Sequence, residues 1–100
     1  MKEIIGNNLL NTEGKVVLDF QADWCMPCKM ITLLLEDLEK EFDEIKFFKI
    51  NVETNQTLTY NYSVGSVPTI IVLEDGKPFS RLVGKKDKDS IRNAIKNPTN

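Results

Sequence analysis

Histidine is absent from this sequence, cysteine occurs only twice, and no long apolar run is present. Without histidine, neither a Ser–His nor a Cys–His nucleophile pair can form. A structural zinc site takes about four ligands, usually cysteine and histidine, and two cysteines do not supply them. Haem attachment through a C-x-x-C-H motif is also excluded, because Lys29 follows Cys28. The two cysteines are left with redox work or an inert role in the core.

Membrane and nucleic-acid functions are disfavoured by further absences. No apolar run approaches the length of a membrane span, and segment 1–6 lacks the apolar centre of a signal peptide. We therefore expect a cytoplasmic protein without a membrane partner. The net charge is −2, and Asp87 interrupts the densest basic patch, which runs from Lys85 to Lys88. Mixed charges of this kind are typical of a hydrated surface, so we expect no nucleic-acid partner.

The residues that are present indicate a globular α/β chain. It has 100 residues, of which 41% are hydrophobic and 28% charged, enough to bury a core of its own. Strand and helix patterns alternate, and Asp75-Gly76 is typical of a tight hairpin turn. The expected strands are 15–20, 45–52, 69–73 and 79–83. The expected helices run from the cysteine pair to about residue 42, from 56 to about 62, and onward from a cap at Asp87.

This order predicts a single domain over residues 1–100. Strands that alternate with helices pair in parallel through right-handed crossovers, and the hairpin adds antiparallel strands. We expect one mixed central sheet of four to five strands with helices on both faces. Segment 2–11 is ambiguous and could form a short strand plus a helical turn. The long helix should bury one apolar stripe, formed by Ile31, Leu34, Leu35, Leu38 and Phe42.

The two cysteines lie three residues apart at the start of this helix. The spacing places both sulfurs on one side of the first turn, where they can close a local disulfide. Free backbone N–H groups and the helix dipole favour a thiolate there, so Cys25 should be the nucleophile and Cys28 the resolving thiol. Pro27 fits the first turn, where a missing N–H is tolerated. Two structural cysteines are the alternative, which the preceding strand and the proline-containing helix start disfavour.

The segment from Asp19 to Lys29, DFQADWCMPCK, resembles the active-site pattern of the thioredoxin family, D-F-x-A-x-W-C-G-P-C-K. A second match is Ser66 to Thr69, SVPT, which is similar to the family motif with a cis-proline beside the active site. The resemblance covers roughly residues 15–96. It implies a thioredoxin fold and a monomeric protein-disulfide reductase that uses no cofactor beyond the Cys25–Cys28 disulfide. Its partners would be a thioredoxin reductase as electron donor and disulfide-containing target proteins.

The resemblance also implies residue roles. Cys25 would attack the target disulfide, and Cys28 would release the target. Asp19 would be a buried acid that handles the proton of Cys28, with Lys49 near it. Pro68 would have a cis peptide bond, and the backbone of Val67 would meet an extended substrate. The remaining residues of the docking surface would be Trp24, Met26, Pro27, Gly65 and Gly84.

From the residues alone, several of these roles have an alternative. Asp19 lies in an apolar strand, where burial would raise its pKa, although it could instead sit at a hydrated strand end. Lys49 could be a surface lysine with only its stem buried. Most X-Pro bonds are trans, so Pro68 could simply open a strand. Trp24 could be a core aromatic rather than a docking residue.

The chain departs from the family pattern at three positions. Met26 replaces the glycine between the cysteines and adds a soft apolar surface, so we expect altered partner preference and a shifted redox potential. Gln21 stands where many thioredoxins have tryptophan, which makes that flank more polar. Leu33 replaces a proline that kinks the long helix, so every backbone hydrogen bond can form and the helix should be straighter.

Three other functions remain to be compared with the reductase. An oxidant or isomerase is disfavoured by the absent signal peptide and the W-C-x-P-C context. A glutathione-dependent, glutaredoxin-like protein usually has an aromatic residue inside the C-x-x-C. A binding subunit with incidental cysteines would keep its activity without Cys25 and Cys28. No glycine-rich nucleotide loop is present, so a flavin or NADPH site would belong to the reductase partner.

Overall fold

The computed structural model describes residues 1–7 and 13–98. Its elements follow the predicted order, including a short strand near the start of the chain. They are β1 (Lys2–Glu3), β2 (Lys15–Gln21), α1 (Met26–Glu41), β3 (Lys46–Asn51), α2 (Gln56–Asn61), β4 (Thr69–Glu74), β5 (Lys77–Val83) and α3 (Lys88–Lys96).

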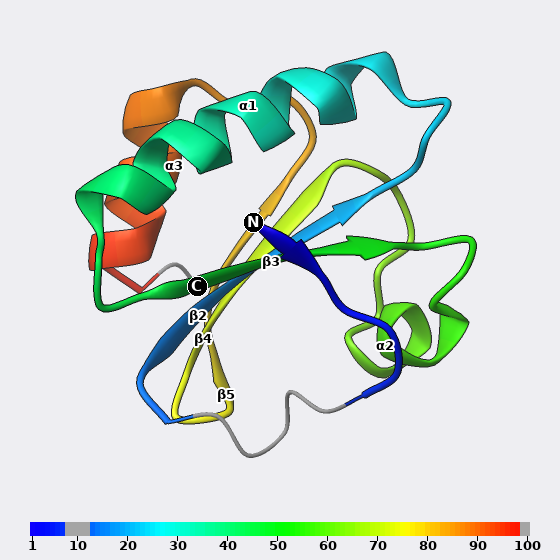
Figure 1. Ribbon diagram of the computed structural model, residues 1–100, viewed down its shortest axis with the longest axis horizontal. Coiled ribbons are helices and arrows are strands. Elements are labelled where there is room, and N and C mark those ends of the chain that lie inside the picture. Colours follow the sequence, from blue (N-terminus) through cyan, green and yellow to red (C-terminus); the bar gives the residue numbers. More distant parts are fainter. Residues whose placement is uncertain (8–12, 99–100) are drawn as a thin grey trace.

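Five strands form one mixed sheet in the order β1–β3–β2–β4–β5. β2 pairs in parallel with β3 and antiparallel with β4, which places it at the centre of the sheet. α1 and α3 lie on one face and α2 on the other (Figure 1). Because both faces of β2 are covered, its residues from Val16 to Phe20 are all buried, which explains the near-continuous apolar run.

Two layers of core separate the sheet from its helices. On one face, Val17 packs with Leu35 of α1 and Ile91 of α3. On the other face, Phe20 packs with Leu58 of α2. Successive residues of a strand point to opposite faces, so the alternation along β2 directs Asp19 toward α1, on the same face as Val17. This direction places a carboxyl under the helix that carries the cysteines.

The element boundaries agree with the predictions to within about two residues. The turn at Asp75 and Gly76 has φ values of 52° and 80°, the left-handed geometry that a two-residue hairpin needs. Three of the predicted stripe residues, Ile31, Leu35 and Leu38, are fully buried, whereas Leu34 and Phe42 pack partly buried at the edge of the core.

Two predictions concern the exposed side of α1 and the start of the chain. α1 runs without interruption through Leu33, and its straightness relative to a proline-containing helix stays a prediction. The short strand expected within segment 2–11 is β1, which pairs with β3. The helical turn expected with this strand is not found at residues 4–7, and the rest of the segment lies outside the described residues. Over the described ranges, no helix is long and apolar enough to cross a membrane.

Candidate active site

The cysteine pair sits where the chain passes from β2 into α1. Cys25 is the N-cap of the helix, with extended backbone dihedrals, and its Sγ accepts a hydrogen bond from the backbone N–H of Cys28 at 3.2 Å. Pro27 occupies the first turn, as predicted. Cys25 and Cys28 form a disulfide with a Cα–Cα distance of 5.3 Å, which is ordinary for a disulfide. When this bond is reduced, the same N–H and the helix dipole stabilise a thiolate at Cys25.

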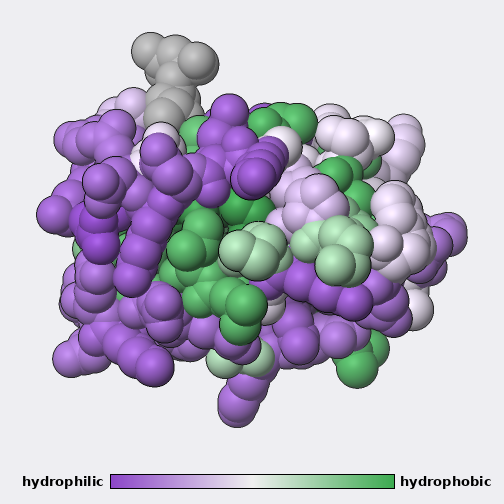
Figure 2. Space-filling view, turned by 90° about the horizontal axis from the view of Figure 1, so that it is seen from above, coloured by the Kyte–Doolittle hydropathy of each residue, from purple (hydrophilic) through white to green (hydrophobic). Residues whose placement is uncertain are grey.

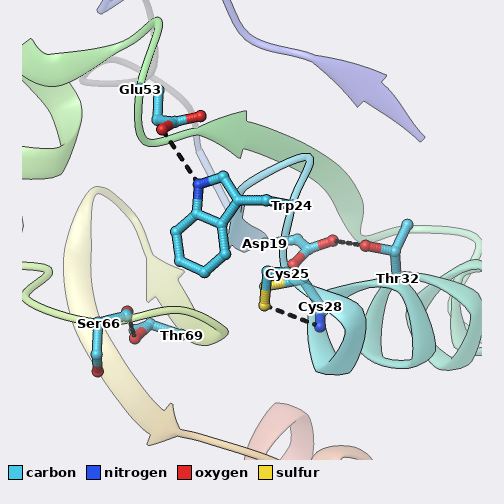
Figure 3. The surroundings of a disulfide bond; sticks show 8 residues. All are labelled: Asp19, Trp24, Cys25, Cys28, Thr32, Glu53, Ser66 and Thr69. Carbon is cyan, nitrogen blue, oxygen red and sulfur yellow. Dashed lines mark hydrogen bonds between the residues drawn. A yellow bond between two sulfur atoms is a disulfide. The ribbon is translucent and has the colours of Figure 1, made fainter.

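The loop before β4 faces the disulfide (Figure 3). It lies at the same end of the sheet, because Thr69 at the start of β4 pairs with Phe20 near the end of β2. The Val67–Pro68 peptide bond is cis, as expected. The side chain of Val67 packs against the small cluster of Ala22 and both cysteines. Two hydrogen bonds hold the loop: Thr69 Oγ1 donates to the carbonyl of Ser66 at 2.8 Å, and the N–H of Gly84 donates to the carbonyl of Pro68 at 2.9 Å.

Gly84 has a backbone conformation that suits glycine. Its φ is 88°, a value that side-chain-bearing residues rarely adopt. In this conformation its N–H meets the Pro68 carbonyl. This hydrogen bond connects Gly84 to the cis-proline loop, and a role of Gly84 in docking stays a prediction.

Beside the disulfide, an open cleft of about 410 Å³ separates Trp24 from the cis-proline loop. The residues that line it are Trp24, Val52, Thr59, Val64, Gly65, Ser66 and Val67. Trp24 is 68% exposed, and its Nε1 donates to Glu53 Oε2 at 3.1 Å. The alternative of a core aromatic is therefore wrong, and the indole forms one wall of the cleft.

Asp19 lies fully buried behind the cysteines. Its Oδ2 accepts a hydrogen bond from Thr32 Oγ1 at 2.6 Å, and its Oδ1 has no hydrogen-bond partner among the described residues. Burial raises the pKa of Asp19 to about 6, although the Thr32 hydrogen bond and the charge of Lys49 oppose the rise. The alternative of a hydrated strand end is wrong, and the carboxyl can exchange a proton near neutral pH.

Lys49 is the register partner of Asp19 on the neighbouring strand β3. It is half-buried, and its positive charge lowers the pKa of Asp19. Lys49 also lines an open recess of about 270 Å³ together with Gln21, Lys29, Thr32 and Leu33. Lys49 is thus a half-buried lysine whose charge acts on the acid. Its part in the reaction stays a prediction.

Comparison with known proteins settles the family. The thioredoxin family model matches residues 3–97. The chain belongs to the thioredoxin family. It is 46% identical over 78 residues to a thioredoxin of Chlamydia caviae, a match that covers 78% of this chain and 76% of that protein. It is 44% identical over 85 residues to a thioredoxin of Bacillus subtilis, with 84% and 82% covered.

A solved structure agrees over nearly the whole chain. A mutant thioredoxin from Halobacterium salinarum superposes with a TM-score of 0.86 at 32% identity, covering 96% of this chain and 87% of that one. The thioredoxin fold is thereby confirmed. Membership of the family together with the Cys25–Cys28 disulfide makes the protein a thiol–disulfide oxidoreductase, a disulfide reductase of the thioredoxin type.

The departure at Met26 has a structural counterpart in this chain. Met26 is 68% exposed, and Met30 and Leu33 are exposed on the same side of α1 at helical spacing. Seen from the side of α1, apolar residues lie among hydrophilic ones (Figure 2). The soft apolar surface expected from Met26 thus extends along the helix.

Several residues at the site belong to no motif and were not singled out from the sequence. Val52 and Glu53 follow β3, whose carboxyl end lies beside that of its parallel neighbour β2, so a rule about strand ends could have found them. Thr32 follows Cys28 by four residues and hence lies on the same helix face, but this spacing does not reveal its partner Asp19. Within the described ranges, no cluster of His, Cys, Asp or Glu could hold a metal ion.

Proposed function

We propose that the protein reduces disulfides of target proteins through a mixed disulfide at Cys25. The thiolate of Cys25 attacks one sulfur of the target, forms an S–S bond to it and displaces the other target sulfur as a thiolate. Cys28 then loses its proton and attacks Cys25 Sγ, which closes the Cys25–Cys28 disulfide and releases the second target thiolate. The observation that carries this assignment is the N-cap position of Cys25, whose Sγ accepts the Cys28 N–H.

Asp19 takes the proton of Cys28 in this scheme. Support comes from its burial, its pKa of about 6 and the absence of a hydrogen bond to Oδ1 within the described part of the chain. An unpaired carboxylate oxygen in a buried site is a ready proton acceptor. Lys49 would moderate the pKa of this acid by its charge from the neighbouring strand.

Target proteins would dock as an extended segment across the cleft beside the disulfide. The backbone of Val67 and the ring of Pro68 would meet the segment on one side, and Trp24 would meet it on the other. Gly65 lines the same cleft, Gly84 holds the loop, and Met26 and Pro27 are exposed at the helix start. Exposed aromatic and methionine side chains are typical of the centre of an interface.

The electrons would come from a thioredoxin reductase, which would reduce the Cys25–Cys28 disulfide by two electrons after each cycle. No further cofactor is needed in this chain, because thiol–disulfide exchange moves both electrons between sulfur atoms. The cytoplasm is the compartment in which such a dithiol acts as a reductant.

Trapping of the mixed disulfide tests the roles of the two cysteines. Cys28→Ser should accumulate a covalent complex with a disulfide-containing target such as insulin, because no thiol at position 28 is present to displace the bound target sulfur from Cys25. Cys25→Ser should form no complex and should reduce insulin only at the background rate. Mass spectrometry of the complex identifies the attached residue. A trapped complex in Cys25→Ser, which could be attached only through Cys28, or full activity of the double Cys25→Ser, Cys28→Ser variant, would contradict the assignment.

The reduction potential distinguishes a reductase from an oxidant. Equilibration with dithiothreitol or glutathione buffers, followed by Trp24 fluorescence, measures it. We expect a value toward the reducing end of the family range, near the reference of about −270 mV for thioredoxin rather than the value of about −120 mV for a strongly oxidising relative. A potential near the oxidising value would instead favour an oxidase or isomerase role.

A further inference from the structure

The hydrogen bond between Thr32 and Asp19 joins two elements behind the active site. A threonine inside a helix often bonds back to the carbonyl four residues earlier. Here Thr32 Oγ1 instead donates to Asp19 Oδ2 on β2, at 2.6 Å. No other hydrogen bond to this carboxyl is present in the described structure, and Oδ1 stays unpaired. One hydroxyl therefore determines which oxygen of Asp19 is held and which is free.

Thr32 is also close to the resolving cysteine. It follows Cys28 by four residues on α1, so the two side chains share one helix face with about 5–6 Å between their Cβ atoms. Cys28 is only 1% exposed on this face. Figure 3 shows the Asp19 carboxyl with one oxygen directed at Thr32 and the other on the side of the cysteine pair.

We infer that Thr32 is a positioning residue for the resolution step, in which it holds Asp19 Oδ2 so that Oδ1 is free to accept the proton of Cys28. This inference rests on the proposed roles of Cys28 and Asp19. In the step, the Cys28 S–H bond breaks and its proton goes to Oδ1. The Cys28 sulfur forms a bond to Cys25 Sγ, and the target sulfur leaves with the electron pair of the mixed disulfide. No further oxidant or reductant is required.

The surroundings of Asp19 show in which direction the Thr32 hydroxyl shifts the pKa of the carboxyl. Lys49 on β3 lowers the pKa of the carboxyl, and Glu36 on α1 raises it. On β4, the register partner of Asp19 is the apolar Ile70. Thr32 contributes the hydrogen bond that favours the ionised form against burial. Removal of the hydroxyl should therefore raise the pKa of Asp19 further and leave fewer molecules with a carboxylate able to take a proton.

The test follows the resolution step directly. Reduced protein mixed with the chromogenic disulfide dithiobis(nitrobenzoate) should release nitrothiobenzoate in two phases. The first depends on reagent concentration and reports attack by Cys25, and the second is independent of concentration and reports attack by Cys28. Measurement of both phases across the acidic and neutral range gives the pH midpoint of each.

Thr32→Val keeps the shape of the side chain and removes the hydroxyl, whereas Thr32→Ser keeps the hydroxyl. We expect Thr32→Val to move the midpoint of the second phase upward by about one pH unit, which slows that phase about tenfold below the midpoint. The first phase should be unchanged, and Thr32→Ser should behave as wild type. In an Asp19→Asn background, Thr32→Val should have no effect on the pH profile.

Several outcomes would overturn the inference. These are an unmoved midpoint in Thr32→Val, equal effects of Val and Ser, or an effect of Thr32→Val that persists without Asp19. A titration of the Asp19 carboxyl carbon by NMR in the oxidised protein checks the same change without kinetics, and a melting curve shows that each variant is folded. Failure of the proposed function is distinguishable, because wild type would then lack the second phase that Cys28→Ser is expected to remove.

Discussion

At the scale of single residues, the buried carboxyl of Asp19 lowers the stability of the fold when it is ionised, although the proposed proton transfer needs the ionised form. The folded-state pKa of Asp19 is about 6, against an ordinary value of 3.8 for aspartate, so the carboxyl is harder to ionise in the fold than in the unfolded chain. The folded state thus binds more protons than the unfolded state between these two values, and the free energy of unfolding falls as pH rises through them. At neutral pH the fold carries an ionised carboxyl that it would be more stable without.

Replacement of this residue tests that statement. Asp19→Asn removes the ionisation and keeps a polar side chain that Thr32 can bond. Its free energy of unfolding should exceed that of wild type by about 3 kcal/mol at about pH 8, and the difference should vanish below about pH 4. Urea denaturation of the oxidised proteins at the two pH values measures it. Asp43→Asn, at an exposed position outside the site, is the control, and an equal gain there would contradict the explanation.

At the scale of elements, each helix that borders the site depends on a specific cap. α1 is capped by Cys25, so the reactive sulfur is itself the group that caps the helix. α2 has only six residues, and its cap is Asn55, whose Oδ1 accepts the N–H of Leu58 at 3.2 Å. The amide of Asn55 also donates to the carbonyls of Ile4 and Gly6. This buried residue therefore joins α2, which supplies Thr59 to the cleft, to the start of the chain.

The loss of this cap should weaken the fold measurably. Asn55→Ala removes the helix cap and leaves two carbonyls without their protein donor, so we expect the free energy of unfolding to fall by about 2 kcal/mol. Asn61→Ala, at the exposed end of the same helix, should change it much less. Denaturation curves of both variants give the comparison. Equal small effects would mean that packing of Leu58 alone holds α2 in place.

At the scale of the whole molecule, the site is assembled from segments that are far apart in the chain. The cysteines follow β2, the cis-proline precedes β4, and Gly84 follows β5. They meet because β2 pairs with β4 and β4 with β5, each in antiparallel register. The hydrogen bond from the Gly84 N–H to the Pro68 carbonyl joins the end of β5 to the loop before β4.

Gly84→Ala should disturb the docking of target proteins more than the thiol–disulfide exchange at the cysteines. A side chain at its φ of 88° is strained by about 1 kcal/mol, and the loop that carries Pro68 should shift in response. We expect slower reduction of insulin but an unchanged reaction with small disulfides. Gly14→Ala is a matched control, because Gly14 has a φ of 78° and lies at the other end of β2. A similar loss of insulin reduction in both variants would show a general effect of stability.

The sequence by itself determined the features that depend on neighbouring residues. The position of the cysteines at a helix start follows from local spacing, and the hairpin at Asp75-Gly76 follows from turn chemistry. The apolar run around Asp19 favoured its burial but left a hydrated strand end open. The motif match added the cis bond at Pro68, which local physics alone left open because most X-Pro bonds are trans.

Only the tertiary structure decided the contacts between elements. Thr32 bonds Asp19 across 13 positions, and Trp24 bonds Glu53 across 29. Such hydrogen bonds depend on distances of a few tenths of an ångström between side chains of different elements. These distances are set by how helices and strands pack, which no periodicity in the sequence encodes. The sequence showed that Cys28 and Thr32 share one helix face. The packing of α1 on β2 decided that the Asp19 carboxyl lies beside them.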